Sequence, residues 1–190
     1  PVEIMPCGPR VMALTRSPQQ IAADGVSTAT ITATVYDTHV NPVRDGTMVG
    51  FTTTNGTLPY DYAEAEDSSK VERSTGDWLE WPDGGASGGE FIYTDTPGAW
   101  VSWTFTGSAV SLIYVREVDG GSVRPLIDGV PMATINLFAA STDYQRETVL
   151  YSGLDPTVPH IVQVECLTGR VRLDALRSGT TTTNGVATAV

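Results

Sequence analysis

Residues 29–36 have the sequence ATITATVY, in which small or apolar side chains alternate with threonines and a tyrosine. Successive side chains of a strand point to opposite faces, so Ile31 and Val35 share one face and the threonines share the other. The dipeptides Asp24-Gly25 and Asn41-Pro42 bracket this run, and both are typical of turns. The stretch predicts a half-buried strand of an antiparallel sheet.

Similar runs follow along the chain, and no stretch shows a helical apolar period. A second strand is predicted from Val49 and Phe51. Between residues 59 and 178, alternation and turn dipeptides predict about eight short strands, the number typical of a jelly roll. The clearest are residues 101–105, 110–114, 133–137, 160–167 and 171–176. The predicted fold class is therefore all-β, built from β-sandwiches.

Charge limits the function classes. The 190 residues carry 22 acidic and 11 basic side chains, a formal net charge of −11. A protein that binds duplex nucleic acid needs the opposite sign, so we expect no nucleic-acid partner. No apolar run is long enough for a membrane-spanning segment.

The two ends of the chain resemble each other in sequence and composition. The run Thr180–Gly185 echoes Thr52–Gly56, and residues 186–190 return to the small, Thr-rich composition of the first segment. The four tryptophans all lie between these runs. We therefore predict a discontinuous outer domain, residues 1–58 plus 179–190, interrupted by an insert at residues 59–178. Insertions are tolerated at exposed turns.

The outer domain carries five short patterns: Ile21–Gly25, Asp37, Asn41–Val43, Gly56–Leu58 and Thr183–Ala187. With these residues it resembles a bacterial immunoglobulin-like domain of the invasin and intimin type. The resemblance implies a sandwich whose closing strand is missing from this chain. Either that strand follows residue 190 in a longer protein, or a neighbouring chain supplies it.

The insert carries a second set of patterns: Gly76–Trp78, Ser87–Gly89, Gly98–Gly107, Ile127–Gly129, His160–Val162 and Leu173–Ala175. With these it resembles the galactose-binding-like jelly rolls, which are similar to carbohydrate-binding modules. The resemblance implies a fold more than a function, because that fold hosts glycan binding, protein contacts and spacing alike.

Aromatic and basic residues of the insert are the candidates for a carbohydrate site. Aromatic rings offer flat apolar partners to the C–H faces of sugars, and polar side chains orient the hydroxyls. Trp103 alternates with Val101 and Phe105, which predicts a core position. The candidate ligand-binding residues are Trp78, Trp81, Trp100, Arg116, Tyr144 and Arg146. Packing remains the alternative for each tryptophan, and solvation the alternative for each polar residue.

Three acidic residues are candidates for a calcium site. The pattern from Ala63 to Glu66 resembles the opening strand of jelly rolls that hold calcium, a cation that prefers carboxylate and carbonyl oxygens. Glu64 and Glu66 are two residues apart and share a strand face. Asp174, on the last predicted strand, is their candidate neighbour. The alternative is a solvated acidic strand without a metal.

A serine motif and the two cysteines each allow a functional and a purely structural interpretation. Gly85–Gly89 matches the G-x-S-x-G pattern of a hydrolase nucleophile, but that motif needs a strand before it and a helix after it. We expect a turn and no catalytic role for Ser87. Cys7 and Cys166 are far apart in sequence, and either a long-range disulfide or a buried free Cys166 fits.

Two functions of different classes therefore compete. In the first, an exported, non-catalytic module binds carbohydrate through the jelly roll, and the immunoglobulin-like domain serves as a stalk. In the second, the chain is a structural subunit of a surface fibre or adhesin, and copies assemble by strand pairing. Both predict an extracellular or cell-surface location.

Overall fold

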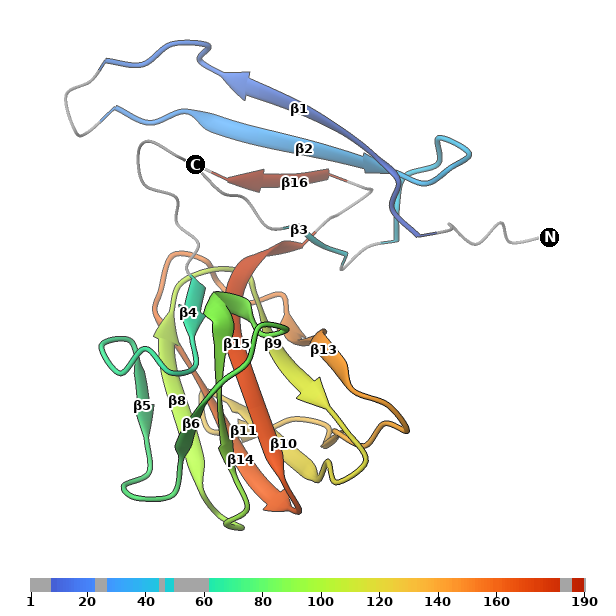
Figure 1. Cartoon of the computed structure of the whole chain (residues 1–190). Helices are drawn as coiled ribbons and strands as arrows, with labels where there is room; N and C mark the ends of the chain where they lie inside the picture. The colour runs from blue at the N-terminus through green and yellow to red at the C-terminus, as the bar shows by residue number, and fades with distance from the viewer. Residues whose placement is uncertain (1–7, 23–26, 45–46, 50–61, 182–185, 190) are drawn as a thin grey trace. The chain divides into compact units, whose positions relative to one another are not determined.

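A computed structural model describes residues 8–22, 27–44, 47–49, 62–181 and 186–189. These residues form β-strands and a 3₁₀ turn, η1 (Ser87–Gly89), with no α-helix among them, which confirms the predicted all-β class. The chain divides into two compact units (Figure 1). The first unit contains Pro1–Tyr60 and Gly179–Val190, and the second contains Asp61–Ser178.

The first unit contains a three-stranded antiparallel sheet in the order β1-β2-β16. Its strands are β1 (Val11–Ser17), β2 (Thr30–Tyr36) and β16 (Val186–Ala189). The strand predicted from alternation is β2, and Ala33 and Val35 on its apolar face are buried with Val43 and Val49. The short strand β3 (Met48–Val49) pairs with Thr180 and Thr181 at the end of β15.

The second unit is a sandwich of two sheets (Figure 1). The first sheet has the order β11-β10-β14-β8-β5, with β12 on β10. Its strands are β5 (Val71–Arg73), β8 (Trp100–Phe105), β10 (Ser122–Ile127), β11 (Val130–Pro131), β12 (Ile135–Asn136) and β14 (His160–Thr168).

The second sheet has the order β13-β9-β15-β7-β6, and β4 pairs with β15. Its strands are β4 (Tyr62–Glu64), β6 (Leu79–Pro82), β7 (Glu90–Thr94), β9 (Ala109–Arg116), β13 (Asp143–Ser152) and β15 (Val171–Thr181). The strand pairs β9–β13, β8–β14, β7–β15 and β6–β7 are antiparallel.

Apolar side chains fill the space between the two sheets. Trp103 is 2% exposed and stacks on Phe105 with ring centroids 5.2 Å apart. Val162, Val164 and Cys166 on the neighbouring strand β14 of the same sheet belong to the same buried cluster. The core position predicted for Trp103 is therefore confirmed.

The second unit has more strands than the expected eight. The strands that sequence patterning missed include β6 and β13, whose side chains are mostly exposed. Edge strands bury neither face fully, so they lack the alternation on which the prediction depended. The run predicted at 133–137 forms only the two-residue strand β12.

The side chain of Cys166 is buried, and its Sγ lies 3.8 Å from the carbonyl oxygen of Gly169. Burial raises the pKa of this thiol. Cys7 lies outside the described residues, so the disulfide stays a prediction. The repeated Thr-Asn-Gly runs also lie largely outside the described residues, in 50–61 and 182–185, so the similarity between them stays a prediction. Among the residues that the structure describes, no helix is long and apolar enough to cross a membrane.

Candidate functional site

A pocket of about 250 Å³ opens on the second unit. It lies on the outer face of the second sheet, because Phe91 and Tyr93 alternate along β7 with Ile92, which faces the core. Its lining residues are Trp81, Asp83, Phe91, Tyr93, Glu117, Arg170 and Arg172.

Strand pairing brings the lining residues together from distant parts of the sequence. Trp81 on β6 is paired with Phe91 on β7, and Tyr93 on β7 is paired with Arg172 on β15. Phe91 is 4% exposed and packs with Ala86 and Val115 under the pocket. The floor is therefore apolar and fixed by the sheet.

Trp81 supplies an open aromatic surface. It is 53% exposed, and its ring meets Tyr93 edge-on, with centroids 6.2 Å apart and an interplanar angle of 81°. The guanidinium of Arg170 lies over the Tyr93 ring, 5.4 Å from its centroid, in cation–π geometry. Tyr93 is thus held by its neighbours, whereas Trp81 has a large apolar area in contact with solvent.

Two arginines form an ion-pair network beside the aromatic rings. Arg170 donates from Nε and Nη2 to Asp95 at 2.8 and 2.7 Å. Arg172, whose side chain is 10% exposed, contacts Glu117 at 3.0 Å and Asp119 at 2.8 Å. Hydrogen bonds from these guanidinium groups hold the pKa of Asp95 and of Asp119 below its ordinary value.

The carboxylate of Asp83 forms another part of the lining. It accepts hydrogen bonds from the Tyr144 hydroxyl and from the backbone N–H of Gly85, both at 2.9 Å. The hydrogen bond to Asp83 raises the pKa of Tyr144. Gln145 adds a hydrogen bond to the carbonyl oxygen of Gly85 at 3.2 Å.

An irregularity in β13 places Tyr144. The register shifts between Asp143 and Arg146, and Gln145 between them has a φ of 50°. Such bulges redirect side chains and are common beside functional sites. Here the bulge directs Tyr144 and Gln145 to the loop after β6.

The structure separates the predicted ligand-binding residues. Trp81 lines the pocket, and Tyr144 reaches it through Asp83. The indole N–H of Trp78 donates to the carbonyl oxygen of Trp100 at 3.0 Å, and Trp78 packs against the core. Trp100 itself is half-buried on β8 of the other sheet.

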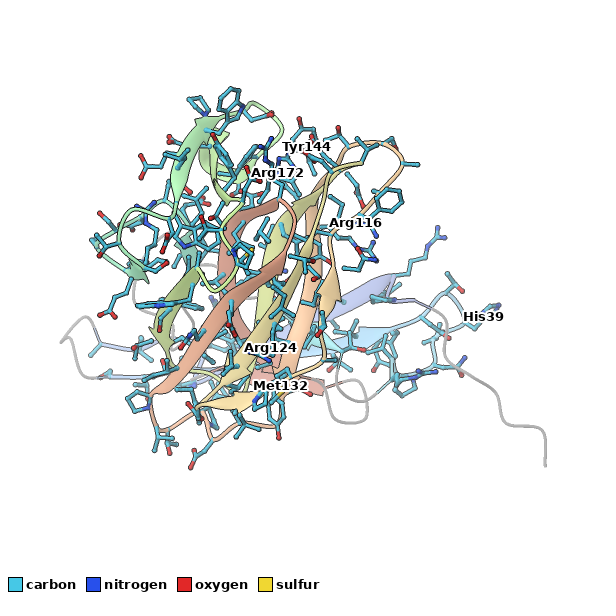
Figure 2. All side chains as sticks on the ribbon, turned by 90° about the horizontal axis from the view of Figure 1, so that it is seen from below. His39, Arg116, Arg124, Met132, Tyr144 and Arg172 are labelled. Carbon is cyan, nitrogen blue, oxygen red and sulfur yellow. The ribbon has the colours of Figure 1, made fainter. Side chains whose placement is uncertain are left out.

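The predicted arginines do not line the pocket. Arg116 donates to Asp143 at 3.0 Å, and Arg146 lies exposed on β13. Figure 2 shows Tyr144, Arg172 and Arg116 toward one end of the second unit, and Arg124 and Met132 toward the opposite end. Arg124 pairs there with Glu165 at 2.6 Å.

Sequence analysis did not select Arg170, Arg172, Glu117 or Tyr93. The spacing of Arg170 and Arg172 was the one available signal, since residues two apart share a strand face. Their acidic partners lie more than fifty positions away in sequence, and only the sheet register brings them close.

A second cavity of the same unit, about 350 Å³ in volume, has a different character. Aliphatic and small polar residues such as Met132, Ile135 and Leu150 line it, with no aromatic or charged side chain. The Trp81 pocket is therefore the candidate site for a polar ligand.

The acidic residues predicted to bind calcium lie close together. β4 ends at Glu64, so Glu66 lies in the following turn and not on the strand as expected. A Cβ at Gly88 would lie 3.2 Å from Oε1 of Glu64 and 3.3 Å from Oε1 of Glu66. Asp174 accepts hydrogen bonds from the backbone N–H of Ser87 at 3.0 and 3.2 Å.

Burial and mutual repulsion perturb these carboxyl groups. Burial chiefly raises the pKa of Glu66 to about 7, and the charges of Glu64, Glu90 and Asp174 raise it further. Burial also chiefly raises the pKa of Asp174 to about 6. Oε2 of Glu66 is buried and has no hydrogen-bond partner in the described structure.

The fit to a metal is incomplete in this arrangement. Within the described ranges, no three His, Cys, Asp or Glu side chains are placed to hold a metal ion. Glu64 instead accepts a hydrogen bond from the Ser87 hydroxyl at 3.0 Å. The crowded carboxyl groups and the orphaned Glu66 oxygen still favour a cation, so calcium stays a prediction.

Ser87 and the histidines are not linked by any described hydrogen bond. The Ser87 hydroxyl contacts Tyr62 at 2.6 Å and Glu64, and the strand β7 follows it where the hydrolase motif has a helix. His160 instead contacts Asp128 at 2.8 Å and the carbonyl oxygen of Asp155 at 2.9 Å. These contacts differ from a nucleophile–base pair.

Part of the chain matches a known family. A family model described as "Invasin, domain 3" matches residues 9–70, which supports the immunoglobulin-like resemblance of the N-terminal segment. The match continues past Tyr60, where the first compact unit ends. No curated protein matches the chain.

Three solved structures are similar to part of the chain, each with a TM-score below 0.5. The Agl-KA catalytic domain is 14% identical, with a TM-score of 0.47. The similar region covers 70% of this chain and 29% of that domain. The catalytic unit of a GH87 alpha-1,3-glucanase from Streptomyces thermodiastaticus strain HF3-3 is 17% identical, with a TM-score of 0.48 and coverages of 68% and 27%.

A family 35 carbohydrate binding module from Clostridium thermocellum is 12% identical, with a TM-score of 0.49. The similar region covers 62% of this chain and 95% of that module. The chain spans less than a third of the length of the two catalytic units.

Proposed function

We propose that the unit Asp61–Ser178 is a non-catalytic carbohydrate-binding module and that its ligand binds in the Trp81 pocket. The observation that carries this proposal is the exposed ring of Trp81 beside fixed carboxylate and guanidinium groups. An apolar platform with a few convergent polar groups is the usual composition of a ligand site.

Each part of the pocket has a role in this proposal. The Trp81 face packs on the C–H face of a sugar ring, in the manner of other apolar contacts to aromatic rings. Asp83 and Glu117 accept hydrogen bonds from sugar hydroxyls. The volume of about 250 Å³ is below the ~300–1,000 Å³ of sites for drug-sized ligands, which favours one or two sugar rings over a long chain.

The first unit has a separate role in the proposal. Its N-terminal segment matches an invasin domain, and its two parts flank the second unit in sequence. We infer an immunoglobulin-like spacer, interrupted by the inserted jelly roll, in an exported surface or secreted protein.

The fibre hypothesis has one specific observation in its favour. β1 is an edge strand of its described sheet, and Val11, Met12 and Leu14 on it are about half exposed or more, at 51%, 54% and 59%. An exposed apolar edge can pair with a strand of another chain. Under this hypothesis the purified chain forms multimers that Leu14→Lys disrupts, measured by light scattering.

A glycan array with the full 190-residue chain tests carbohydrate binding. We expect reproducible hits for the unmodified chain that Trp81→Ala abolishes. Tyr151→Ala is the matched control, because Tyr151 is an aromatic residue of β13 that is 42% exposed and does not line the pocket. Circular dichroism verifies that each variant is folded. A blank array with folded protein would reject the proposal.

A further inference from the structure

The guanidinium groups of the pocket are already occupied by carboxylates. Arg170 is bidentate to Asp95 and lies 3.4 Å from Asp119, and Arg172 contacts both Asp119 and Glu117. Neither arginine presents an unpaired charge to a ligand. The network therefore holds the arginines in place but leaves little positive potential in the pocket.

Asp83 adds a negative charge that no cation balances in the described structure. Its carboxylate accepts hydrogen bonds from the neutral Tyr144 hydroxyl and from the backbone N–H of Gly85. Asp83 and Glu117 line the pocket, and Asp95 and Asp119 pair with its arginines from outside the lining. These four carboxylates and two guanidinium groups leave an excess of two negative charges in and around the pocket. The formal charge of the whole chain, −11, has the same sign.

This charge balance separates two classes of sugar. A neutral sugar brings O–H donors, which match the acceptor oxygens of Asp83 and Glu117. A uronic acid or a sulfated sugar brings a negative charge beside Asp83 with no free cation to pair it. At the short distances within one pocket, such repulsion is sufficient for about a tenfold difference in affinity.

We propose that the pocket selects sugar units without a carboxylate or sulfate group, and that Asp83 is the specificity-determining residue. Tyr144 and Gly85 fix the Asp83 carboxylate, so it cannot easily turn away from an anionic ligand. An anionic ligand could gain a cation only by displacing a carboxylate, either from Arg170, which is bidentate to Asp95, or from Arg172, whose side chain is almost buried. The proposal rests on carbohydrate binding at this pocket, as proposed above.

The test compares matched pairs of ligands on the full chain by calorimetry or NMR titration. The pairs are methyl glucoside with methyl glucuronide, and methyl galactoside with methyl galacturonide. In each pair that binds, we expect the neutral glycoside to bind about tenfold more tightly than the uronide at low salt. High salt should narrow the gap by screening the repulsion.

Asp83→Asn tests the residue assignment. The asparagine keeps one acceptor oxygen, replaces the other with an NH2 donor and removes the charge, so the ratio of neutral to uronide affinity should fall toward one. Glu72→Gln is the matched control: it removes a charge from an exposed position on β5 in the other sheet, and the ratio should not change.

The outcomes distinguish the two proposals. Uronides that bind as tightly as the neutral sugars, or more tightly, would overturn the selectivity and leave carbohydrate binding in place. A ratio unchanged by Asp83→Asn would overturn the role of Asp83. No binding by either member of both pairs, together with a blank array, would reject carbohydrate binding and the selectivity with it.

Discussion

The hydroxyl of Tyr144 on β13 donates a hydrogen bond to the carboxylate of Asp83, 2.9 Å away and 61 positions earlier in the sequence. The bulge at Gln145 produces this contact, because it redirects the side chains at the start of the strand. The contact joins the loop after β6 to the edge of the second sheet and thereby fixes one wall of the pocket.

Tyr144→Phe should weaken sugar binding about threefold to tenfold, the range expected for one lost hydrogen bond. The ring remains, so the melting temperature should change little. Calorimetry with a glycan that binds on the array measures the effect, and Tyr151→Phe serves as the control. An unchanged affinity would show that the orientation of Asp83 does not matter.

Gly85→Ala should disturb the same wall by steric overlap. A Cβ at Gly85 would lie 2.8 Å from ring atoms of Tyr144, whereas a Cβ at Gly84 would have no neighbour within 4 Å. Overpacking of this kind costs about 1–3 kcal/mol. We expect Gly85→Ala to lower both thermal stability and affinity.

Gly84→Ala is the neighbouring control and should change neither quantity. Equal effects of the two alanines would mean that loop flexibility, and not the Tyr144 contact, requires glycine here.

The stability of the chain should depend on pH through His160. Both ring nitrogens face acceptor oxygens, from Asp128 and from the carbonyl of Asp155, which favours the doubly protonated ring. Burial alone lowers the pKa of His160, but these hydrogen bonds and the nearby carboxylates outweigh it and raise the pKa overall.

A raised folded-state pKa means that the stabilisation is complete below the unfolded value of ~6.5 and is lost as pH rises through the folded value. The free energy of unfolding, measured in urea, should therefore decrease from about pH 6 to about pH 8. His160→Gln should make this decrease smaller, leaving the part that the raised pKa values of Glu66 and Asp174 contribute over the same range. An unaltered profile in the variant would exclude His160 as its source.

Calcium should stabilise the second unit most at alkaline pH. Without metal, the raised pKa values of Glu66, to about 7, and Asp174, to about 6, mean that these groups favour the folded state at low pH. That contribution disappears as pH rises through those values, because charged carboxylates are then forced together. A bound cation requires the ionised carboxylates and relieves their repulsion.

We expect excess calcium to raise the melting temperature at about pH 8 and much less at about pH 5, relative to a chelator. Glu66→Gln should reduce the increase. Equal melting temperatures with calcium and with chelator at the higher pH would remove calcium from the description of this cluster.

Sequence patterning predicted the fold where strands have one buried and one exposed face. β2 and β8 show this clearly: Ala33, Val35, Val101 and Trp103 are buried at alternating positions. Patterning failed at β1, whose seven residues are all exposed. Where neither face of a strand is buried, apolar and polar side chains need not alternate.

The site was predictable only in part. Trp81 and Tyr144 were selected by residue type, and Glu64, Glu66 and Asp174 by their pattern. Trp78 was also selected, yet its indole is satisfied by the carbonyl oxygen of Trp100 and it packs on the core. The roles of Arg170 and Arg172 depend on partners that only the folded sheet brings near them.

The four indole N–H signals of the chain provide the most direct test of the central claim, since Trp78, Trp81, Trp100 and Trp103 are the only tryptophans. Each signal can be assigned by its loss in a single Trp→Phe variant, and the full ¹⁵N-labelled chain is then titrated with a neutral glycan that binds on the array. We predict that the Trp81 signal shifts in a saturable manner while the Trp100 and Trp103 signals stay in place. A saturable shift of Trp100 with Trp81 unmoved would place the sugar on the other sheet and contradict the proposed site.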